Sequence, residues 1–395
     1  MIDDTRDRRK GGGELARFTR DLTAEARAGR LEPVRCRTEE IARVIDILLR
    51  HGKNNPALVG ASGVGKTAIA EGFAQRIAGG DVPIVLRDVR ILSLDHVALL
   101  AGTTYRGQYE ERIRTLVDET TASPDVILFI DELHNLIGQG TAMGAAMDAA
   151  NMLKPSLVRG DFRVIGATTD EEYERWVAGD PALERRFQKV AVRELGVPET
   201  LDILRARKER LERHHNVVIT DEALHAAVEL TDKFVTDRRR PDKAIDALDE
   251  ACAHTQAVSK YPAKAEALMK DRVRRLRDAA SAHRKSGGGP NNGQGNEAGD
   301  GQWPQMAKDS MNALERFGAE LESMFSGVPA GAPAPAQPPP PPRSEPEVAE
   351  PVTSMGELET ELSRVLADEG IVVRGHDVAR VVGLMSGRVI DWGTA

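Results

Sequence analysis

Short apolar runs alternate with amphipathic stretches along the first half of the chain. The runs at residues 57–59, 89–94, 126–130 and 162–167 have the length and composition of buried strands. Between them, apolar residues recur every three or four positions and predict helices over residues 38–49, 66–78, 108–117 and 145–153. Strands that alternate with helices are typical of a mostly parallel sheet covered on both faces. The sequence therefore predicts an α/β core, which we place at residues 14–195.

The pattern changes on either side of these strands. Before them we expect one helix over residues 15–27, and Thr38 is the expected N-cap of the next helix. After residue 195 no further strand is predicted. Helices expected at residues 198–214, 221–234 and 241–258 form a small all-helical domain over residues 196–262.

The two ends of the chain have a different composition. Residues 1–13 are charged and end in glycines, so we expect a disordered tail. Residues 263–352 combine a predicted helix with Gly-rich and Pro-rich linkers, and residues 353–395 form a small helical segment. Within the linkers, residues 303–325 carry an apolar stripe at helical spacing. We favour a helix that packs on its own protein over one that binds a partner.

Composition narrows the classes of function. Asp and Glu total 62 against 54 Lys and Arg, and this net charge of −8 argues against a large nucleic-acid interface. Only two cysteines, Cys36 and Cys252, are present, which fits a reducing cytoplasm rather than a disulfide framework. No apolar run is long enough to span a bilayer, and the first residues do not form a signal peptide. We expect a cytoplasmic protein with no membrane and no nucleic-acid partner.

A phosphate-binding motif, G-x-x-x-x-G-K-[ST], follows the first predicted strand of the core. Its residues are Gly60, Ala61, Ser62, Gly63, Val64, Gly65, Lys66 and Thr67. The glycines let backbone N–H groups approach phosphate oxygens, Lys66 can reach the β- and γ-phosphates, and the Thr67 hydroxyl can bind Mg²⁺. The alternative is a Gly-rich turn that binds nothing. We favour ATP binding, because the strand, loop and helix occur in the order that an anion site needs.

Two carboxylates directly follow the buried run at residues 126–130. At the end of a strand beside the phosphate loop, Asp131 can hold Mg²⁺ and Glu132 can orient the attacking water. The alternative is an ordinary acidic strand end. By themselves, Thr168 and Thr169 at the end of a later strand are a weak signal, and a pair such as Arg185 and Arg186 is more often a solvated surface charge.

These motifs occur together with others in one order. They are residues 60–67, 131–134, 166–169, 183–187 and 241–246. In this combination, residues 20–260 resemble the first ATPase module of the Clp-type AAA+ protein unfoldases and disaggregases. The resemblance implies a P-loop core with the sheet order 5-1-4-3-2 and a helical lid domain. It also implies that Thr169 is a sensor residue, and that Arg185 and Arg186 reach into the site of a neighbouring subunit.

The same resemblance implies how such a protein would act. Arginine fingers supplied by a neighbour imply self-association into a ring, usually a hexamer. In the family, the loop that matches residues 101–107 faces a central pore, and its aromatic residue grips the polypeptide being pulled. Tyr105 has that position here, although a tyrosine packed at the start of a helix is the alternative. Residues 138–144 resemble a second pore loop less specifically.

Some segments depart from the family pattern. Residues 34–37, Val-Arg-Cys-Arg, replace a stretch that usually contains glycine and lines the adenine pocket. A large N-terminal substrate domain and a second ATPase module are not recognisable in the sequence, so we expect a single-ring version of the family.

The leading hypothesis is an ATP-hydrolysing protein-remodelling motor that acts on an unidentified protein substrate. The alternative is a nucleotide-dependent assembly or regulatory module that binds ATP with little turnover and recruits partners through its C-terminal region. A nucleic-acid loader of the AAA+ kind is disfavoured by the acidic charge balance.

Overall fold

The structure is a computed structural model that describes residues 13–102, 106–137, 146–160, 162–286, 354–390 and 392–393. It divides into two compact units, of which the first comprises residues Met1–Glu266 and Leu362–Ala395 and the second Ala267–Glu361. Residues 1–12 of the expected tail, the linkers and the stripe at residues 303–325 lie outside the described residues. None of the helices in the described part of the chain is long and apolar enough to cross a membrane.

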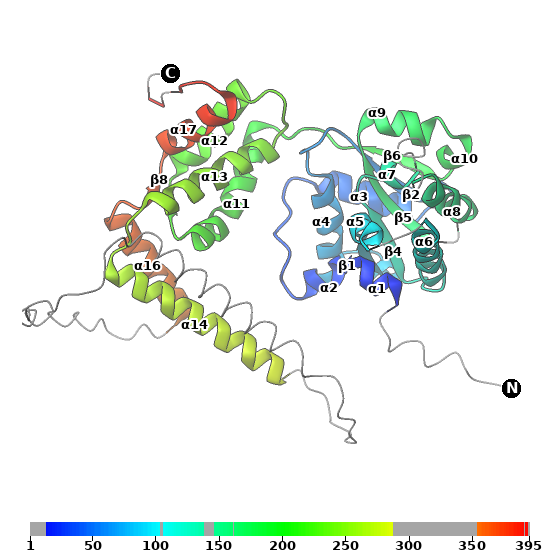
Figure 1. Cartoon of the computed structure of the whole chain (residues 1–395), viewed down its shortest axis with the longest axis horizontal. Helices are drawn as coiled ribbons and strands as arrows, with labels where there is room; N and C mark the ends of the chain where they lie inside the picture. The colour runs from blue at the N-terminus through cyan, green and yellow to red at the C-terminus, as the bar shows by residue number, and fades with distance from the viewer. Residues whose placement is uncertain are drawn as a thin grey trace, which may run out of the picture. The chain divides into compact units, whose positions relative to one another are not determined.

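A six-stranded sheet forms the centre of the α/β core within the first unit (Figure 1). Its strands are β1 (Thr19–Asp21), β2 (Asn55–Val59), β3 (Arg90–Leu94), β4 (Val126–Ile130), β5 (Arg163–Thr168) and β6 (Phe187–Ala191). They lie in the order β1-β3-β4-β5-β2-β6, and only β1 is antiparallel to its neighbour. When β2 to β6 are counted as strands one to five, the order read from β6 is 5-1-4-3-2. The predicted fold class and strand order are therefore confirmed, with β1 added at the edge.

Helices cover both faces of this sheet because successive strand residues point to opposite faces. In β4, Ile127 and Phe129 belong to a core that also contains buried residues of α3 (Thr38–Leu48) and α4 (Lys66–Ala78). Leu128 of the same strand belongs to a second core with residues of α6 (Arg106–Thr121) and α8 (Ala146–Arg159). Buried on both faces, the central strand β4 is apolar throughout, as expected for a parallel sheet.

The expected single helix over residues 15–27 is wrong. The chain instead forms α1 (Glu14–Phe18), then β1, then α2 (Leu22–Arg27). Thr19, Arg20 and Asp21 pair with β3, and the Asp21 carboxylate accepts a hydrogen bond from Ala24 N to begin the second helix. The prediction that Thr38 caps α3 is also wrong, because Arg37 precedes the first helical residue and provides no side-chain cap.

The lid domain contains α11 (Val197–His215), α12 (Asp221–Phe234) and α13 (Asp242–Val258). A short parallel pair, β7 (Val218–Ile219) with β8 (Val372–Val373), joins it to the C-terminal α17 (Gly375–Ser386), which packs on α12 and α13. The prediction of no further strand is therefore wrong. Strands of two residues are too short to give an alternating pattern, and their pairing spans more than 150 positions of sequence.

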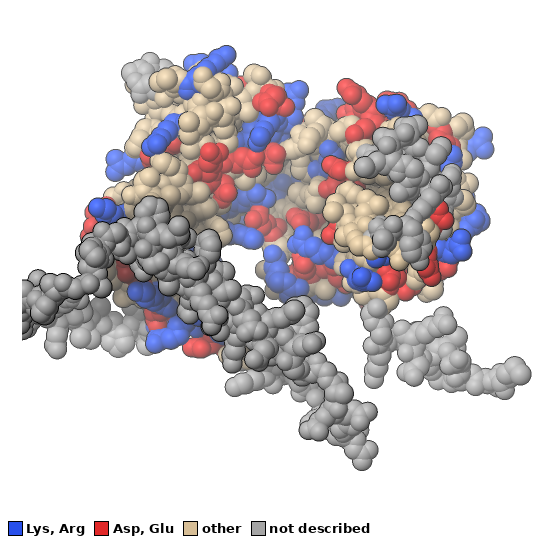
Figure 2. Space-filling view, in the orientation of Figure 1, with Lys and Arg blue, Asp and Glu red and all other residues tan. Residues whose placement is uncertain are grey.

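Short elements complete the described chain. In the first unit they are η2 (Ile84–Leu86), α5 (His96–Leu100), α7 (His134–Ile137), α9 (Asp170–Tyr173), η3 (Glu174–Ala178) and α10 (Pro181–Glu184). Apart from Ser354, the described residues of the second unit belong to α14 (Ala263–Ser286) and α16 (Met355–Asp368), which both extend into the first. Acidic and basic side chains are interspersed over the face of the molecule drawn in Figure 2.

Candidate nucleotide-binding site

The phosphate loop connects buried β2 to α4 through a backbone that only glycine adopts easily. Gly63 has a φ of +78° and Gly65 a φ of +90°, both in the left-handed region. At Gly60 the constraint is space, because a Cβ atom would lie 2.2 Å from the Val192 carbonyl oxygen. Glycine is therefore needed at Gly63 and Gly65 for the backbone conformation and at Gly60 for space. Together these glycines allow the loop to lead into the start of α4.

Lys66, the first residue of α4, folds back over this loop. Its Nζ donates hydrogen bonds to the carbonyl oxygens of Gly60, at 2.8 Å, and Ala61, at 2.9 Å. Burial lowers the pKa of the Lys66 ammonium, while the negative charge of Asp131 opposes that effect. An ammonium held by two weak acceptors in a half-buried place is well suited to a phosphate, which offers stronger charge-assisted bonds.

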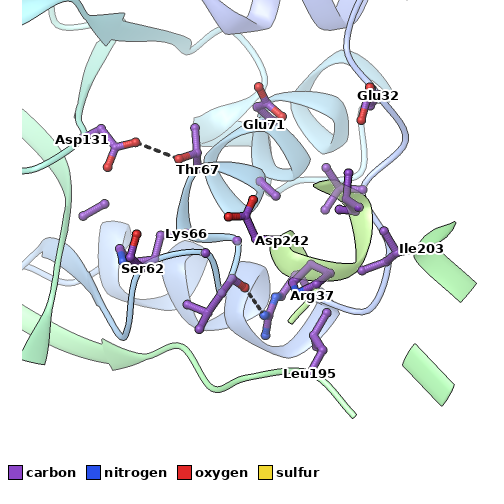
Figure 3. A pocket seen from close by; sticks show the side chains of 18 of the residues that line it. Glu32, Arg37, Ser62, Lys66, Thr67, Glu71, Asp131, Leu195, Ile203 and Asp242 are labelled. Atoms are coloured by element: carbon purple, nitrogen blue, oxygen red, sulfur yellow. Dashed lines mark hydrogen bonds between the residues drawn. The ribbon is translucent and has the colours of Figure 1, made fainter. Parts of the chain in front are cut away.

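A hydrogen bond joins the side chains of Thr67 and Asp131, as Figure 3 shows. The Thr67 hydroxyl donates to Asp131 Oδ2 over 2.7 Å, and Asp131 comes directly after β4. The other oxygen of Asp131 accepts the backbone N–H of Glu132 at 2.9 Å. Hydroxyl and carboxylate oxygens are the donors that Mg²⁺ prefers, so this pair fits the expected metal.

Glu132 has an unusual backbone conformation, with a φ of +49°. Such a conformation in a residue other than glycine costs roughly 1–3 kcal/mol and persists only where its surroundings impose it. Here the next residue, Leu133, donates its N–H to Ala167 O at 2.9 Å and lies over Gly166, where a Cβ atom would come within 2.6 Å of the leucine. The turn places Glu132 at the cavity described below, and Asn135 Nδ2 holds its carboxylate at 2.6 Å.

Thr169 begins α9 and forms a capping box with Glu172. The Thr169 hydroxyl donates to Glu172 Oε2 over 2.8 Å, and Thr168 and His134 approach the same oxygen at 3.1 and 2.9 Å. Partial burial by itself would raise the pKa of Glu172, but these hydrogen bonds and His134 hold it below its usual value. Sequence reasoning assigned no role to Glu172, although its position three residues after Thr169 is the spacing of a capping box.

A cavity of about 590 Å³ connects these residues to the lid (Figure 3). We call the part formed by residues 62–67, Asp131 and Glu132 its phosphate end. The nucleoside end is the part formed by residues 32–35, Arg37, Glu71 and the lid-side residues Leu195, Ile203, Arg207, Pro241, Asp242 and Ile245. Thr168 and Thr169 also line the cavity.

The predicted adenine segment, residues 34–37, contributes three of its four residues to the cavity. Val34, Arg35 and Arg37 line it. Arg37 is only 3% exposed, pairs with Glu40 at 2.7 Å and donates to the carbonyl oxygens of Val64 and Arg193, so it joins this segment to the phosphate loop. Cys36 has a φ of +60°, and its thiol points to Asp202 Oδ2 at 3.7 Å rather than lining the cavity. Burial raises the pKa of this thiol, and the Asp202 carboxylate adds to the effect.

The lid contributes residues to which sequence reasoning gave no role. Arg207 of α11 forms an ion pair with Glu32 at 2.6 Å, and Arg210 approaches the same carboxylate at 3.4 Å. Asp242 starts α13 and lies over Gly63 of the phosphate loop; burial and the nearby Asp246 raise its pKa. Residues 241–246 form one of the family motifs in the sequence, but no local pattern marks Leu195, Ile203 or Arg207 as neighbours of the cavity.

The predicted arginine fingers do not line this cavity. Arg185 is exposed, and Arg186 donates to the Arg159 carbonyl oxygen at 3.3 Å, beside Gly160. Both follow α10, in the turn that leads to β6. Tyr105 and the second predicted pore loop, residues 138–144, lie outside the described residues.

The fold and the cavity define a P-loop nucleotide-binding protein with a helical lid. Residues 56–195 match the family described as "ATPase family associated with various cellular activities (AAA)", and residues 196–294 match the AAA lid domain. The chain belongs to the AAA ATPase family, and the resemblance to its Clp-type members is confirmed by the similarities below.

Two curated relatives illustrate the similarity. The chain is 56% identical to the chaperone protein ClpB of Aquifex aeolicus (strain VF5) over 239 residues, which are 60% of this chain and 24% of that protein. It is 50% identical to the negative regulator of genetic competence ClpC/MecB of Bacillus subtilis (strain 168) over 269 residues, which are 67% of this chain and 33% of that protein. The chain thus spans about a quarter to a third of the length of these relatives.

Solved structures give the same result. The S. cerevisiae Hsp104–ADP complex superposes with a TM-score of 0.57 at 46% identity, over 62% of this chain and 41% of that one. The S. cerevisiae Hsp104–casein complex in its extended conformation gives a TM-score of 0.56 at the same identity, over 62% and 42%.

Proposed function

We propose that this chain is the motor subunit of a protein-remodelling ring that hydrolyses ATP. The observation that supports it most is the convergence of Lys66, Thr67, Asp131 and Glu132 at one end of a single cavity. A module that only binds nucleotide does not need a carboxylate at the phosphate end to orient water. Glu132 is nevertheless held there in a costly backbone conformation. The convergence therefore favours the motor over the regulatory alternative.

In this proposal the triphosphate lies along the start of α4. The N–H groups of the loop and the Lys66 ammonium bind the phosphates, and Thr67 and Asp131 hold Mg²⁺. Mg²⁺ held by these two residues would supply positive charge that stabilises the phosphate oxygens during hydrolysis. Glu132 orients a water molecule whose oxygen attacks the γ-phosphorus as the bond to the bridging oxygen breaks. ADP and inorganic phosphate result, and the proton of the water passes to Glu132 and then to solvent.

Thr169 is proposed as the residue that responds to the γ-phosphate. Its hydroxyl is donated to Glu172 in the described structure, so contact with phosphate or water requires that this hydroxyl be shared or turned. Thr169 is also the N-cap of α9, so a change in its bond to Glu172 would alter the cap of that helix.

Completion of the site is proposed to come from a second copy of the chain. Arg185 and Arg186 do not line their own cavity, and Arg185 is exposed. An arginine at the developing γ-phosphate charge raises the hydrolysis rate by about 10³–10⁵. Because each site then needs a neighbour, we infer a closed ring, with six subunits as the expected number.

The substrate of this motor is proposed to be a polypeptide. One Hsp104 structure that this chain resembles is a complex with casein, and the ClpB relatives are named chaperone proteins. Tyr105 is the residue proposed to grip the chain, because an aromatic ring can pack on any side chain without reading sequence.

The test is the size of the Glu132→Gln form with and without ATP. This substitution keeps the shape of the side chain but removes the carboxylate, so ATP should bind and persist. Light scattering should show a ring with ATP and smaller species without it, while the hydrolysis rate falls by about 10²–10⁴. Glu39→Gln, an exposed change on α3, is the matched control and should hydrolyse normally. Rapid hydrolysis by Glu132→Gln, or a monomer in saturating ATP, would contradict the proposal.

A further inference from the structure

Glu71 lies on α4, one helical turn beyond Thr67, and lines the cavity. In the view of Figure 3 it lies between Thr67 and Glu32. One turn further on, Gln75 ties the opposite wall to the same helix, because it accepts a hydrogen bond from Val34 N at 3.2 Å and donates one to Glu32 O at 2.5 Å. Glu71 is therefore fixed between the phosphate end and the segment at residues 32–35, where the nucleoside of a bound nucleotide belongs.

Among the described residues, none donates a hydrogen bond to the Glu71 carboxylate. Its side chain is 23% exposed, and within the described part of the chain its one ion pair is with Arg20 at 4.0 Å. Arg20 is itself 56% exposed and makes a closer pair with Glu25 at 2.5 Å. Burial raises the pKa of Glu71, and Arg20 opposes this only in part. A half-buried carboxylate without a donor is costly, and a ligand that supplies the donor removes that cost.

The other carboxylates of the nucleoside end are placed differently. Glu32 is engaged by Arg207 and Arg210 of the lid. Asp242 packs against Gly63 of the phosphate loop and begins α13, where the helix N-terminus favours negative charge. Glu71 is the carboxylate that faces the cavity from the helix along which the nucleotide is expected to lie.

We propose that Glu71 accepts a hydrogen bond from a donor group of the bound nucleoside and so sets which nucleosides this site prefers. The inference rests on the proposed nucleotide binding and deepens it. Two kinds of donor have the required chemistry: the ribose hydroxyls and the 6-amino group of adenine. Inosine carries an oxygen acceptor in place of that amino group, and it should be rejected if the base is the donor.

The test is the dissociation constant of four diphosphates, so that hydrolysis does not interfere. ADP, 2′-deoxy-ADP, 3′-deoxy-ADP and inosine diphosphate are titrated against the unaltered chain, Glu71→Gln and Glu71→Ala. In the unaltered chain, the analogue that lacks the relevant donor should bind about ten- to a hundredfold more weakly than ADP, as expected for a bond to a charged group. In Glu71→Ala this ratio should fall to about one, with Glu71→Gln between the two.

The controls separate a failure of the inference from a failure of the proposed function. Glu39→Gln should keep the selectivity of the unaltered chain, and thermal unfolding should show that the Glu71 variants are folded. If ADP binds but every variant keeps the same ratios among the four nucleotides, the inference is wrong and the proposed function stands. If the unaltered chain binds none of the four, both are wrong.

Discussion

The two ends of the nucleotide cavity are built in different ways. At the phosphate end, two short segments that each follow a central strand bring Lys66, Thr67, Asp131 and Glu132 together. At the nucleoside end, residues 32–35, Arg37 and Glu71 meet lid residues that come more than 120 positions later. The first end is fixed by the sheet, while the second is joined to the lid by ion pairs such as Glu32–Arg207. In the proposed function, the residues that carry the chemistry therefore follow strands of the sheet, whereas those that recognise the nucleoside lie partly on the lid.

The largest expected effect comes from removing the cation of the phosphate end. Lys66→Ala should lower the rate of ATP hydrolysis by at least about 10²–10³, because no other lysine among the described residues lines the cavity to stabilise the developing charge. Steady-state phosphate release measures it. Lys260→Ala, an exposed lysine after α13, is the matched control and should retain the full rate. A Lys66→Ala protein that kept most of its activity would remove the basis for calling this the phosphate end.

A second prediction concerns the close approach of the phosphate loop to the residues after β6. Gly60→Ala places a Cβ atom 2.2 Å from the Val192 carbonyl oxygen, so the free energy of unfolding should fall by about 1–3 kcal/mol. Urea unfolding measures it. Gly52→Ala is the matched control, because nothing lies within 4 Å of the Cβ atom added there. Equal stability of the two variants would show that the phosphate end is less constrained than its geometry indicates.

The network behind the phosphate end should give a pH dependence of stability. Hydrogen bonds hold the pKa of Glu172 below 4.5, so its charged form is favoured in the folded state. The stability it contributes is present above about pH 4.5 and is lost as the pH falls through the lowered pKa. Thermal unfolding between neutral and acid pH should therefore show a larger loss for the unaltered chain than for Glu172→Gln. Parallel curves for the two proteins would contradict this.

The smallest expected effect concerns Cys36, which adjoins the nucleoside end but does not line the cavity. Cys36 holds a φ of +60°, where glycine is favoured. Cys36→Gly should raise the free energy of unfolding by up to about 1 kcal/mol, because the relieved strain exceeds the added flexibility. Cys36→Ser keeps the Cβ atom, so its free energy of unfolding should not rise. If glycine destabilised the chain instead, the contacts of the thiol with Glu199 and Asp202 would outweigh the strain.

The contrast between the ends also explains what the sequence could predict. The α/β core follows from the alternation of apolar strands and amphipathic helices, and the residues expected at the phosphate end lie in contiguous motifs that each follow a strongly apolar strand. The strand order is implied by the family resemblance. The lid-side residues of the cavity share no such motif, since helix packing between distant segments brings them there. The sequence shows that residues 34–37, which include Cys36, lack the glycine usual in the family. It does not show that the Cys36 thiol points to Asp202, because that contact depends on where α11 lies.

The errors in secondary structure have the same origin. β1 interrupts a stretch with helical spacing because three residues gain an edge position beside β3. The β7–β8 pair joins residues that are far apart in sequence. In both cases tertiary pairing, which leaves no local pattern, decides the conformation. The roles of Arg185, Arg186 and Tyr105 rest on the family resemblance and stay predictions.

The central claim is that ATP is hydrolysed at a site completed by a neighbouring copy. The most direct measurement is the ATPase rate of mixed assemblies made from Glu132→Gln and the double variant Arg185→Ala, Arg186→Ala. Each protein alone should be nearly inactive, because the first lacks the carboxylate and the second the fingers. Co-assembled, a double-variant subunit keeps its own Glu132 and receives arginines from a Glu132→Gln neighbour, so hydrolysis should partly return. A mixture as inactive as its parents, or a double variant active by itself, would contradict the claim.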